Sequence, residues 1–112
     1  MSKILIVGYG SIGRRHHKNL LNYNKDFYFY ILTRQKIKNN KKNTRFVKNI
    51  AEVKEKIDYL FICTGANEHL KYIYLFILKV QKIFVEKPLS QNSKGLIKLY
   101  QFCKKNKIKI FV

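Results

Sequence analysis

The chain has 112 residues, which is enough for one domain with a hydrophobic core. Apolar residues make up 46% of the sequence, which excludes a disordered tail, and the longest unbroken apolar run, residues 72–78, is too short to cross a bilayer. The formal charge of +18 comes mainly from lysine, in a sequence that is also rich in Asn, Ile, Tyr and Phe. Codons for these residues are rich in A and T, and no recognised nucleic-acid-binding module appears. The charge therefore indicates genomic base bias on a solvated surface rather than nucleic-acid binding.

The N-terminus and the cysteines favour a cytoplasmic protein without a metal site. Residues 1–3 lead directly into a short apolar run that is too short for a secretory signal. Cys63 and Cys103 show neither metal-ligand nor redox spacing. Two thiols without a disulfide framework fit a reducing compartment. We therefore expect a cytoplasmic location, no membrane association and no bound metal.

The first predicted element is a buried strand at residues 4–7, which breaks into the glycine-rich turn GYGSIG at residues 8–13. Gly8 allows a tight turn, Gly10 lets the backbone approach a pyrophosphate, and Gly13 lets the next helix pack closely on the strand. The start of that helix offers free N–H groups and the positive end of its dipole to phosphates. The turn predicts dinucleotide binding. The alternative is a strand–turn–helix unit whose glycines serve packing alone.

The helix after this turn is expected to end within residues 22–25. Its apolar face is predicted from a helical spacing of Ile12, His16, Leu20 and Tyr23. The next predicted elements are a strand at 27–32, a basic loop at 33–44, a short strand at 46–47 and a short helix at 49–56. Asn49 is the expected cap of the short helix.

The second half of the chain continues the alternation of strands and helices. The predicted elements are a strand at 58–63, a helix at 67–79, a strand at 82–85, a helix at 90–105 and a strand at 108–112. Ser90 is the expected cap of the last helix. The residues that this helix is expected to turn inward are Leu96, Leu99, Tyr100 and Cys103. This alternation predicts an α/β fold in one domain, residues 1–112. Its doubly wound parallel sheet, a Rossmann sheet, has the strand order 3-2-1-4-5-6.

The end of the second predicted strand bears on the choice of cofactor. In NAD-binding sheets an acidic residue about 20 positions after the glycines takes the ribose 2′-hydroxyl. Here the strand ends in Thr33 and Arg34, with no acidic residue nearby. A guanidinium pairs bidentately with a phosphate, so the sequence favours NADP over NAD. The alternative is that Arg34 is a solvated loop cation.

Two further polar stretches follow the fourth and fifth predicted strands, CTGANEH at residues 63–69 and EKPL at residues 86–89. Ligands of open α/β sheets bind at the carboxyl ends of strands, so both stretches can face the nicotinamide half of a dinucleotide. Taken alone, His69 is more often the start of a helix than a catalytic group, and Lys87 is one lysine among many.

Taken in order, GYGSIGRRHHKNL, FICTGANEHL and VEKPLS resemble the Gfo/Idh/MocA family over residues 3–112, with EKP the most specific part. The resemblance implies an N-terminal NAD(P)-binding Rossmann domain followed by an α/β domain that binds substrate. It also implies hydride transfer between a nicotinamide cofactor and a carbinol carbon of a sugar, cyclitol or nucleotide sugar.

The resemblance further implies a role for each matching residue, from one end of the cofactor to the other. The pyrophosphate would be held by Gly8, Gly10, Ser11, Ile12 and Gly13. The cofactor's two riboses and nicotinamide would be bound by Thr33, Arg34, Thr64, His69 and Glu86. Lys87 would be catalytic and contact the substrate oxygen. The sequence departs from the family at residues 65–66, where Gly-Ala stands for the usual Pro-Asn.

The family continues into a substrate domain that supplies an acid–base histidine, and we expect this chain to lack that domain. On this view the chain binds a dinucleotide and has no turnover alone. A stand-alone or split nucleotide-binding module is the alternative, and a basic nucleic-acid-binding protein is the least favoured one.

Overall fold

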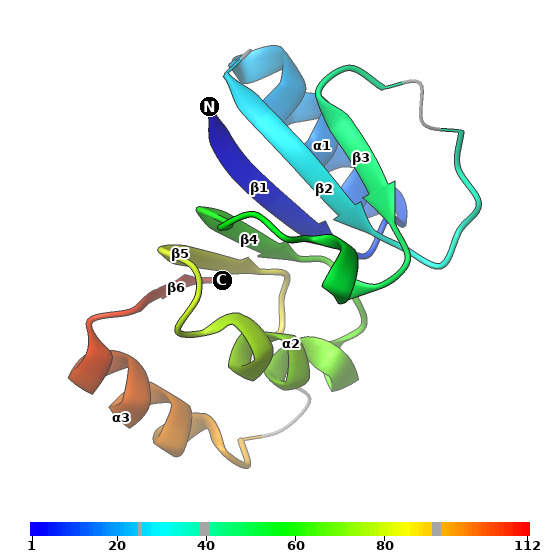
Figure 1. The fold of residues 1–112 in the computed structure, drawn as a ribbon. Helices are drawn as coiled ribbons and strands as arrows, with labels where there is room; N and C mark the ends of the chain where they lie inside the picture. The colour runs from blue at the N-terminus through cyan, green and yellow to red at the C-terminus, as the bar shows by residue number, and fades with distance from the viewer. Residues whose placement is uncertain (25, 39–40, 91–92) are drawn as a thin grey trace.

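A computed structural model describes residues 1–24, 26–38, 41–90 and 93–112. Six parallel strands form one sheet in the order β3-β2-β1-β4-β5-β6, as Figure 1 shows. The strands are β1 (Ser2–Val7), β2 (Phe27–Leu32), β3 (Thr44–Val47), β4 (Tyr59–Ile62), β5 (Lys82–Val85) and β6 (Lys109–Phe111). This sheet confirms the predicted fold class and strand order.

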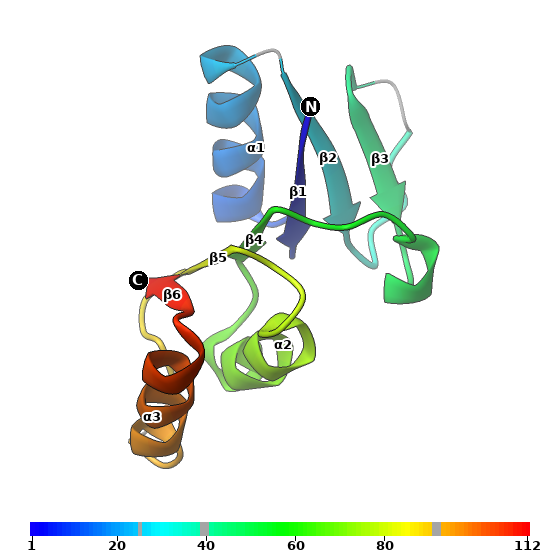
Figure 2. The same cartoon turned by 60° about the vertical axis from the view of Figure 1, so that its left-hand side comes forward.

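Helices lie on both faces of the sheet (Figure 2). They are α1 (Ser11–Tyr23), α2 (His69–Phe76) and α3 (Leu96–Asn106), with 3₁₀ turns η1 (Ile50–Glu52) and η2 (Ala66–Glu68). Ile4 and Ile6 of β1 point to the α1 side, and Leu5 and Val7 point to the α2 and α3 side. All four side chains are at most 1% exposed, because a parallel sheet buries both faces.

Three of the predicted helices are longer than the observed ones, whereas α1 ends within the expected residues. The predicted helix at 49–56 is only the η1 turn, although Asn49 caps it as expected and forms a capping box with Glu52. The predicted helix at 67–79 begins as η2, and its regular part is α2. The last helix begins after Gly95 and not at Ser90, because Gly95 has φ 82° and breaks the helical path. Of the predicted segments, positions 25, 39–40 and 91–92 lie outside the described residues.

Each of two predicted helix faces includes one strongly exposed residue. Tyr23 of α1 is 81% exposed, and the buried positions of α1 are Gly13 and His17. Gly13 packs against the end of β1, so the buried face of α1 follows Gly13 and not the spacing of its most apolar residues. In α3, Leu99 is buried as predicted but Tyr100 is 66% exposed. Among the described residues, no helix is long and apolar enough to cross a membrane.

His17 is a buried polar residue, with 1% of its surface exposed, and the predicted apolar face of α1 did not include it. Burial, with a smaller contribution from the charge of Lys41, lowers the pKa of His17 from 6.5 to about 4. The unfolded chain therefore binds an extra proton between these pH values. We expect the free energy of unfolding to fall as the pH drops from 6.5 towards 4, by at most about 1.4 kcal/mol per pH unit from this group.

Urea unfolding at pH 7, 6, 5 and 4 measures this dependence. His17→Gln removes the titrating group, so its free energy of unfolding should fall less steeply over the same range. Equal slopes for the two proteins would show that His17 is not held neutral in the folded state.

Candidate functional site

The carboxyl ends of β1, β2, β3 and β4 enclose a cleft of about 480 Å³. Residues from each strand end and from α2 line it, among them Gly8, Thr33, Arg34, Lys48 and Thr64. Ligands of open α/β sheets bind at this edge, where the strand order reverses on either side of β1. Four of the predicted cofactor-binding residues thus come to one site: Gly8, Thr33, Arg34 and Thr64.

The glycine-rich turn joins β1 to α1. Gly8 has φ 94°, and a Cβ there would stand 2.8 Å from the carbonyl oxygen of Cys63. A Cβ on Gly13 would overlap the carbonyl oxygen of Gly8. Both glycines are therefore required by the fold itself. Gly10 differs, because a Cβ there would meet no atom of the described residues within 4 Å. Its backbone borders open space, which is what a ligand that approaches the main chain needs.

The N-terminus of α1 adds an anion-binding group beside Gly10. In the part of the chain that the structure describes, no side chain caps this helix and its first turn carries no acidic residue. The backbone N–H of Arg14 already donates to the carbonyl oxygen of Gly10, at 3.0 Å. The N–H groups of Ser11, Ile12 and Gly13 precede it and have no intrahelical partner. These groups and the helix dipole suit a pyrophosphate.

The adenosine end of the cleft is built on the residues that follow β2. Thr33 is 8% exposed, and its Oγ1 accepts the N–H of Gln35 at 3.2 Å. Arg34 is exposed on the cleft, and within the described residues it makes no hydrogen bond or ion pair. Lys48, directly after β3, and Lys71 of α2 add positive charge, with Glu68 the acidic residue of the lining. Lys48 was not among the predicted site residues, although its place directly after a strand could have identified it.

Gln35 ties this end to the glycine-rich turn. Its Nε2 donates to the carbonyl oxygen of Tyr9 at 2.9 Å, and its Oε1 accepts from Nη2 of Arg14 at 2.7 Å. The Arg14 guanidinium also lies over the Tyr9 ring, 4.6 Å from its centroid. No sequence signal pointed to Gln35, because its partners are 21 and 26 positions away.

Thr64 and His69 belong to the segment that follows β4. Oγ1 of Thr64 is a buried polar atom without a hydrogen-bond partner among the described residues. His69 is 1% exposed, with Nδ1 2.8 Å from the carbonyl oxygen of Pro88 and Nε2 2.8 Å from that of Thr64. A neutral imidazole donates to one of these oxygens and a protonated ring donates to both. Either way, His69 joins the turn after β4 to the turn after β5.

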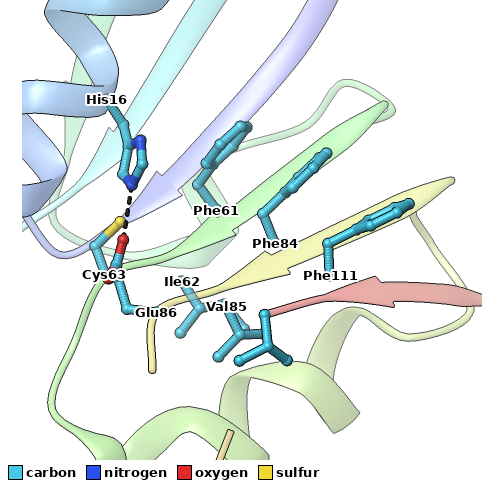
Figure 3. A pocket seen from close by; sticks show the side chains of 9 residues that line it. His16, Phe61, Ile62, Cys63, Phe84, Val85, Glu86 and Phe111 are labelled. Atoms are coloured by element: carbon cyan, nitrogen blue, oxygen red, sulfur yellow. Dashed lines mark hydrogen bonds and ion pairs between the residues drawn. The ribbon is translucent and has the colours of Figure 1, made fainter. Parts of the chain in front are cut away.

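Glu86 and Lys87 follow β5. Oε1 of Glu86 lies 2.8 Å from Nε2 of His16 on α1, and both side chains are about one-third exposed (Figure 3). This pair was not foreseen, because His16 was assigned to the apolar face of its helix. Lys87 is exposed, and the peptide bond between Lys87 and Pro88 is cis.

Cys63 lies beside this pair, in a small pocket of about 170 Å³ (Figure 3). Burial, helped by the charge of Glu86, raises the pKa of Cys63 to about 12, so the thiol stays protonated and is a poor nucleophile. The same pocket is bordered by the stacked rings of Phe61, Phe84 and Phe111, with centroids 4.6 and 5.0 Å apart. No cluster of metal-ligating side chains occurs in the described ranges.

The model of the oxidoreductase family with an NAD-binding Rossmann fold matches residues 2–112. No curated protein matches the chain. The solved structures include an oxidoreductase from Bacillus cereus, with 19% identity over 99% of this chain and a TM-score of 0.82. An NAD-binding protein from Listeria innocua has 18% identity over 97% of this chain and a TM-score of 0.70.

The WlbA dehydrogenase from Chromobacterium violaceum, solved with NADH and UDP-GlcNAcA, has 14% identity over 99% of this chain and a TM-score of 0.77. At these identities the likeness to solved structures concerns the fold. This chain spans about a third of each of the three structures, 34% of their length. The family match over nearly all residues agrees with the resemblance carried by the three motifs. The chain therefore belongs to the Gfo/Idh/MocA oxidoreductase family, in which it is the NAD-binding Rossmann domain.

Proposed function

We propose that the cleft binds NADP, and NAD less tightly, as the cofactor half of an oxidoreductase. The proposal rests on Gly10. A Cβ there would meet no atom of the described residues within 4 Å, and Gly10 stands beside the uncapped N-terminus of α1. A glycine that the fold does not need there is explained by a ligand that approaches the backbone. The unpartnered Oγ1 of Thr64 supports the same view, since a ribose hydroxyl would satisfy it.

The proposed cofactor runs across the sheet edge from the end of β2 to the end of β5. Thr33 and Arg34 bind the adenosine ribose and its 2′-phosphate, with Lys48 as a second cation. The pyrophosphate lies on the turn from Gly8 to Gly13. The nicotinamide half is served by Thr64, His69 and Glu86. Because His69 is buried between two carbonyl oxygens, it acts on the cofactor by holding the turn that carries Thr64.

Lys87 is the proposed catalytic residue. Bound nicotinamide supplies hydride-transfer chemistry. An exposed ammonium near the proposed nicotinamide end can bind the substrate oxygen, orient it and stabilise negative charge that develops on it. We propose a sugar, cyclitol or nucleotide sugar as substrate. A substrate-binding domain would supply the opposite wall and the acid–base partner, so residues 1–112 alone should bind cofactor without turnover.

Arg34 provides the test of the cofactor preference. We expect NADPH to bind more tightly than NADH, because a charge-assisted pair with the 2′-phosphate forms only with NADPH. Arg34→Ala should weaken NADPH binding about tenfold and leave NADH binding within about twofold. Titration of each reduced nucleotide, followed by its fluorescence, measures both dissociation constants. Arg45→Ala, at an exposed arginine of β3 that does not line the cleft, is the matched control.

Two outcomes would contradict different parts of the proposal. Equal affinities for both nucleotides, unchanged in Arg34→Ala, would remove the 2′-phosphate assignment and leave dinucleotide binding intact. Failure of the folded wild-type chain to bind either nucleotide would remove the proposed function itself.

A further inference from the structure

Tyr9, between Gly8 and Gly10, is held on all sides. It is 4% exposed, and the edge-to-face partner of its ring is Phe46 of β3, with centroids 5.3 Å apart. The Arg14 guanidinium lies over the ring, and Gln35 donates to the Tyr9 carbonyl oxygen at 2.9 Å. The residue between the two glycines is therefore fixed at its ring and at its backbone.

The Tyr9 hydroxyl begins a chain of buried hydrogen bonds. It lies 2.8 Å from Nδ1 of His17, and Nε2 of His17 lies 2.9 Å from Oγ1 of Thr44. Oγ1 of Thr44 donates to the carbonyl oxygen of Lys42, at 2.9 Å. A threonine hydroxyl has one proton, so Oγ1 accepts the proton of His17 Nε2–H. Nδ1 is then the acceptor for the Tyr9 hydroxyl, and His17 is neutral.

The hydrogen bonds that join Tyr9, His17 and Thr44 fix a part of the turn that steric contacts do not fix. A Cβ on Gly8 or Gly13 would meet nearby backbone, whereas a Cβ on Gly10 would meet no atom of the described residues within 4 Å. The N–H of Arg14 holds the Gly10 carbonyl oxygen at 3.0 Å, and the peptide link that enters Gly10 is held through Tyr9. Tyr9 in turn is anchored through α1 to the start of β3, by way of His17 and Thr44.

We propose that Tyr9 is a positioning residue for pyrophosphate binding, held in place by the hydrogen bond from its hydroxyl to His17. The proposal rests on the proposed function, because it assumes that the turn binds a dinucleotide. On this proposal the buried hydroxyl of Tyr9 contributes to the affinity for the phosphates and does not contribute to the affinity for adenosine.

Tyr9→Phe tests this assignment by removing a single oxygen atom. ADP and adenosine are the probes, since they differ only in the pyrophosphate. We expect the variant to bind ADP about five- to tenfold more weakly than the wild type, in line with the loss of one buried hydrogen bond, and to bind adenosine within twofold of it. Titrations followed by NMR chemical shifts reach such weak affinities and report the fold in the same spectra. Tyr30→Phe is the matched control, because Tyr30 is a buried strand tyrosine that does not line the cleft.

A pair of substitutions at His17 separates positioning from general destabilisation. In His17→Asn the amide stands near the place of Nδ1 and can still accept from Tyr9. In His17→Gln the longer side chain reaches the place of Nε2 and Thr44. We expect His17→Asn to bind ADP within about threefold of the wild type, and His17→Gln to bind as weakly as Tyr9→Phe.

Unchanged ADP affinity in folded Tyr9→Phe would overturn the proposal, as would an equal loss for ADP and adenosine. Equal ADP affinities for the two His17 variants would also count against it. If the wild type binds neither ADP nor NADPH, the proposed function fails instead. Should the His17 variants unfold, Tyr9→Phe still decides the question.

Discussion

Gly13→Ala is expected to destabilise the domain by about 3 kcal/mol, a large share of the stability of a domain of this size. The new Cβ would overlap the carbonyl oxygen of Gly8. That oxygen has little freedom to move, because Gly8 has φ 94° and its N–H donates to the Leu32 carbonyl oxygen at 2.9 Å. Alanine is the better helix former by about 1 kcal/mol, so the expected loss is what remains after this gain.

Urea and thermal unfolding, followed by circular dichroism, measure this loss. A change of about 3 kcal/mol corresponds to a fall in Tm of 10 °C or more for a domain of this length. A Tm within about 2 °C of the wild type would show that α1 can move away from β1 without penalty. The close approach of helix and strand would then not be the reason for this glycine.

The sheet could be predicted from sequence because each strand carries its own signal. The apolar run of residues 4–7 and the aromatic run at 27–32 are buried on both faces of the sheet. The segment between these two strands has room for a single helical crossover. Helix ends and helix faces depend on contacts that hydropathy does not record. His17 is polar and yet faces inward, because Tyr9 and Thr44 supply its hydrogen bonds. Gly95, with its positive φ, precedes the first residue of α3, whereas the expected cap was Ser90.

The candidate site divides in the same way. Residues within two positions after a strand, such as Thr33 and Thr64, could be placed at the sheet edge from the strand pattern alone. Side-chain pairs across the fold could not. His16 and Glu86 meet although they are 70 positions apart, and nothing in either local sequence indicates the other. His69 was expected near the cofactor, but only coordinates reveal that both its ring nitrogens face backbone carbonyl oxygens.

Gly10→Ala is expected to weaken cofactor binding and to leave the stability of the domain nearly unchanged, whereas Gly13→Ala is expected to lower the stability. The Gly10 backbone, with φ −78° and ψ −162°, is open to any residue, and a Cβ there meets no atom of the described residues within 4 Å. Gly10 is the N-cap of α1, where alanine is less favourable than glycine, so the loss of stability should stay within about 1 kcal/mol. In the proposed complex the same Cβ would occupy space that the pyrophosphate needs. Affinity for NADH and NADPH should therefore fall at least about tenfold.

The two nucleotides must lose affinity together, because the pyrophosphate is common to both and the 2′-phosphate is not. This equal loss distinguishes Gly10→Ala from Arg34→Ala, which should affect NADPH alone. Fluorescence titration and urea unfolding on the same preparation measure the affinity for each nucleotide and the free energy of unfolding. Gly13→Ala is the matched alanine substitution, in which the free energy of unfolding is expected to fall. If Gly10→Ala binds both nucleotides as tightly as the wild type, the open space beside Gly10 is not where the pyrophosphate lies. If it unfolds instead, the glycine serves the fold after all. Only retained stability with lost affinity connects this position to cofactor binding.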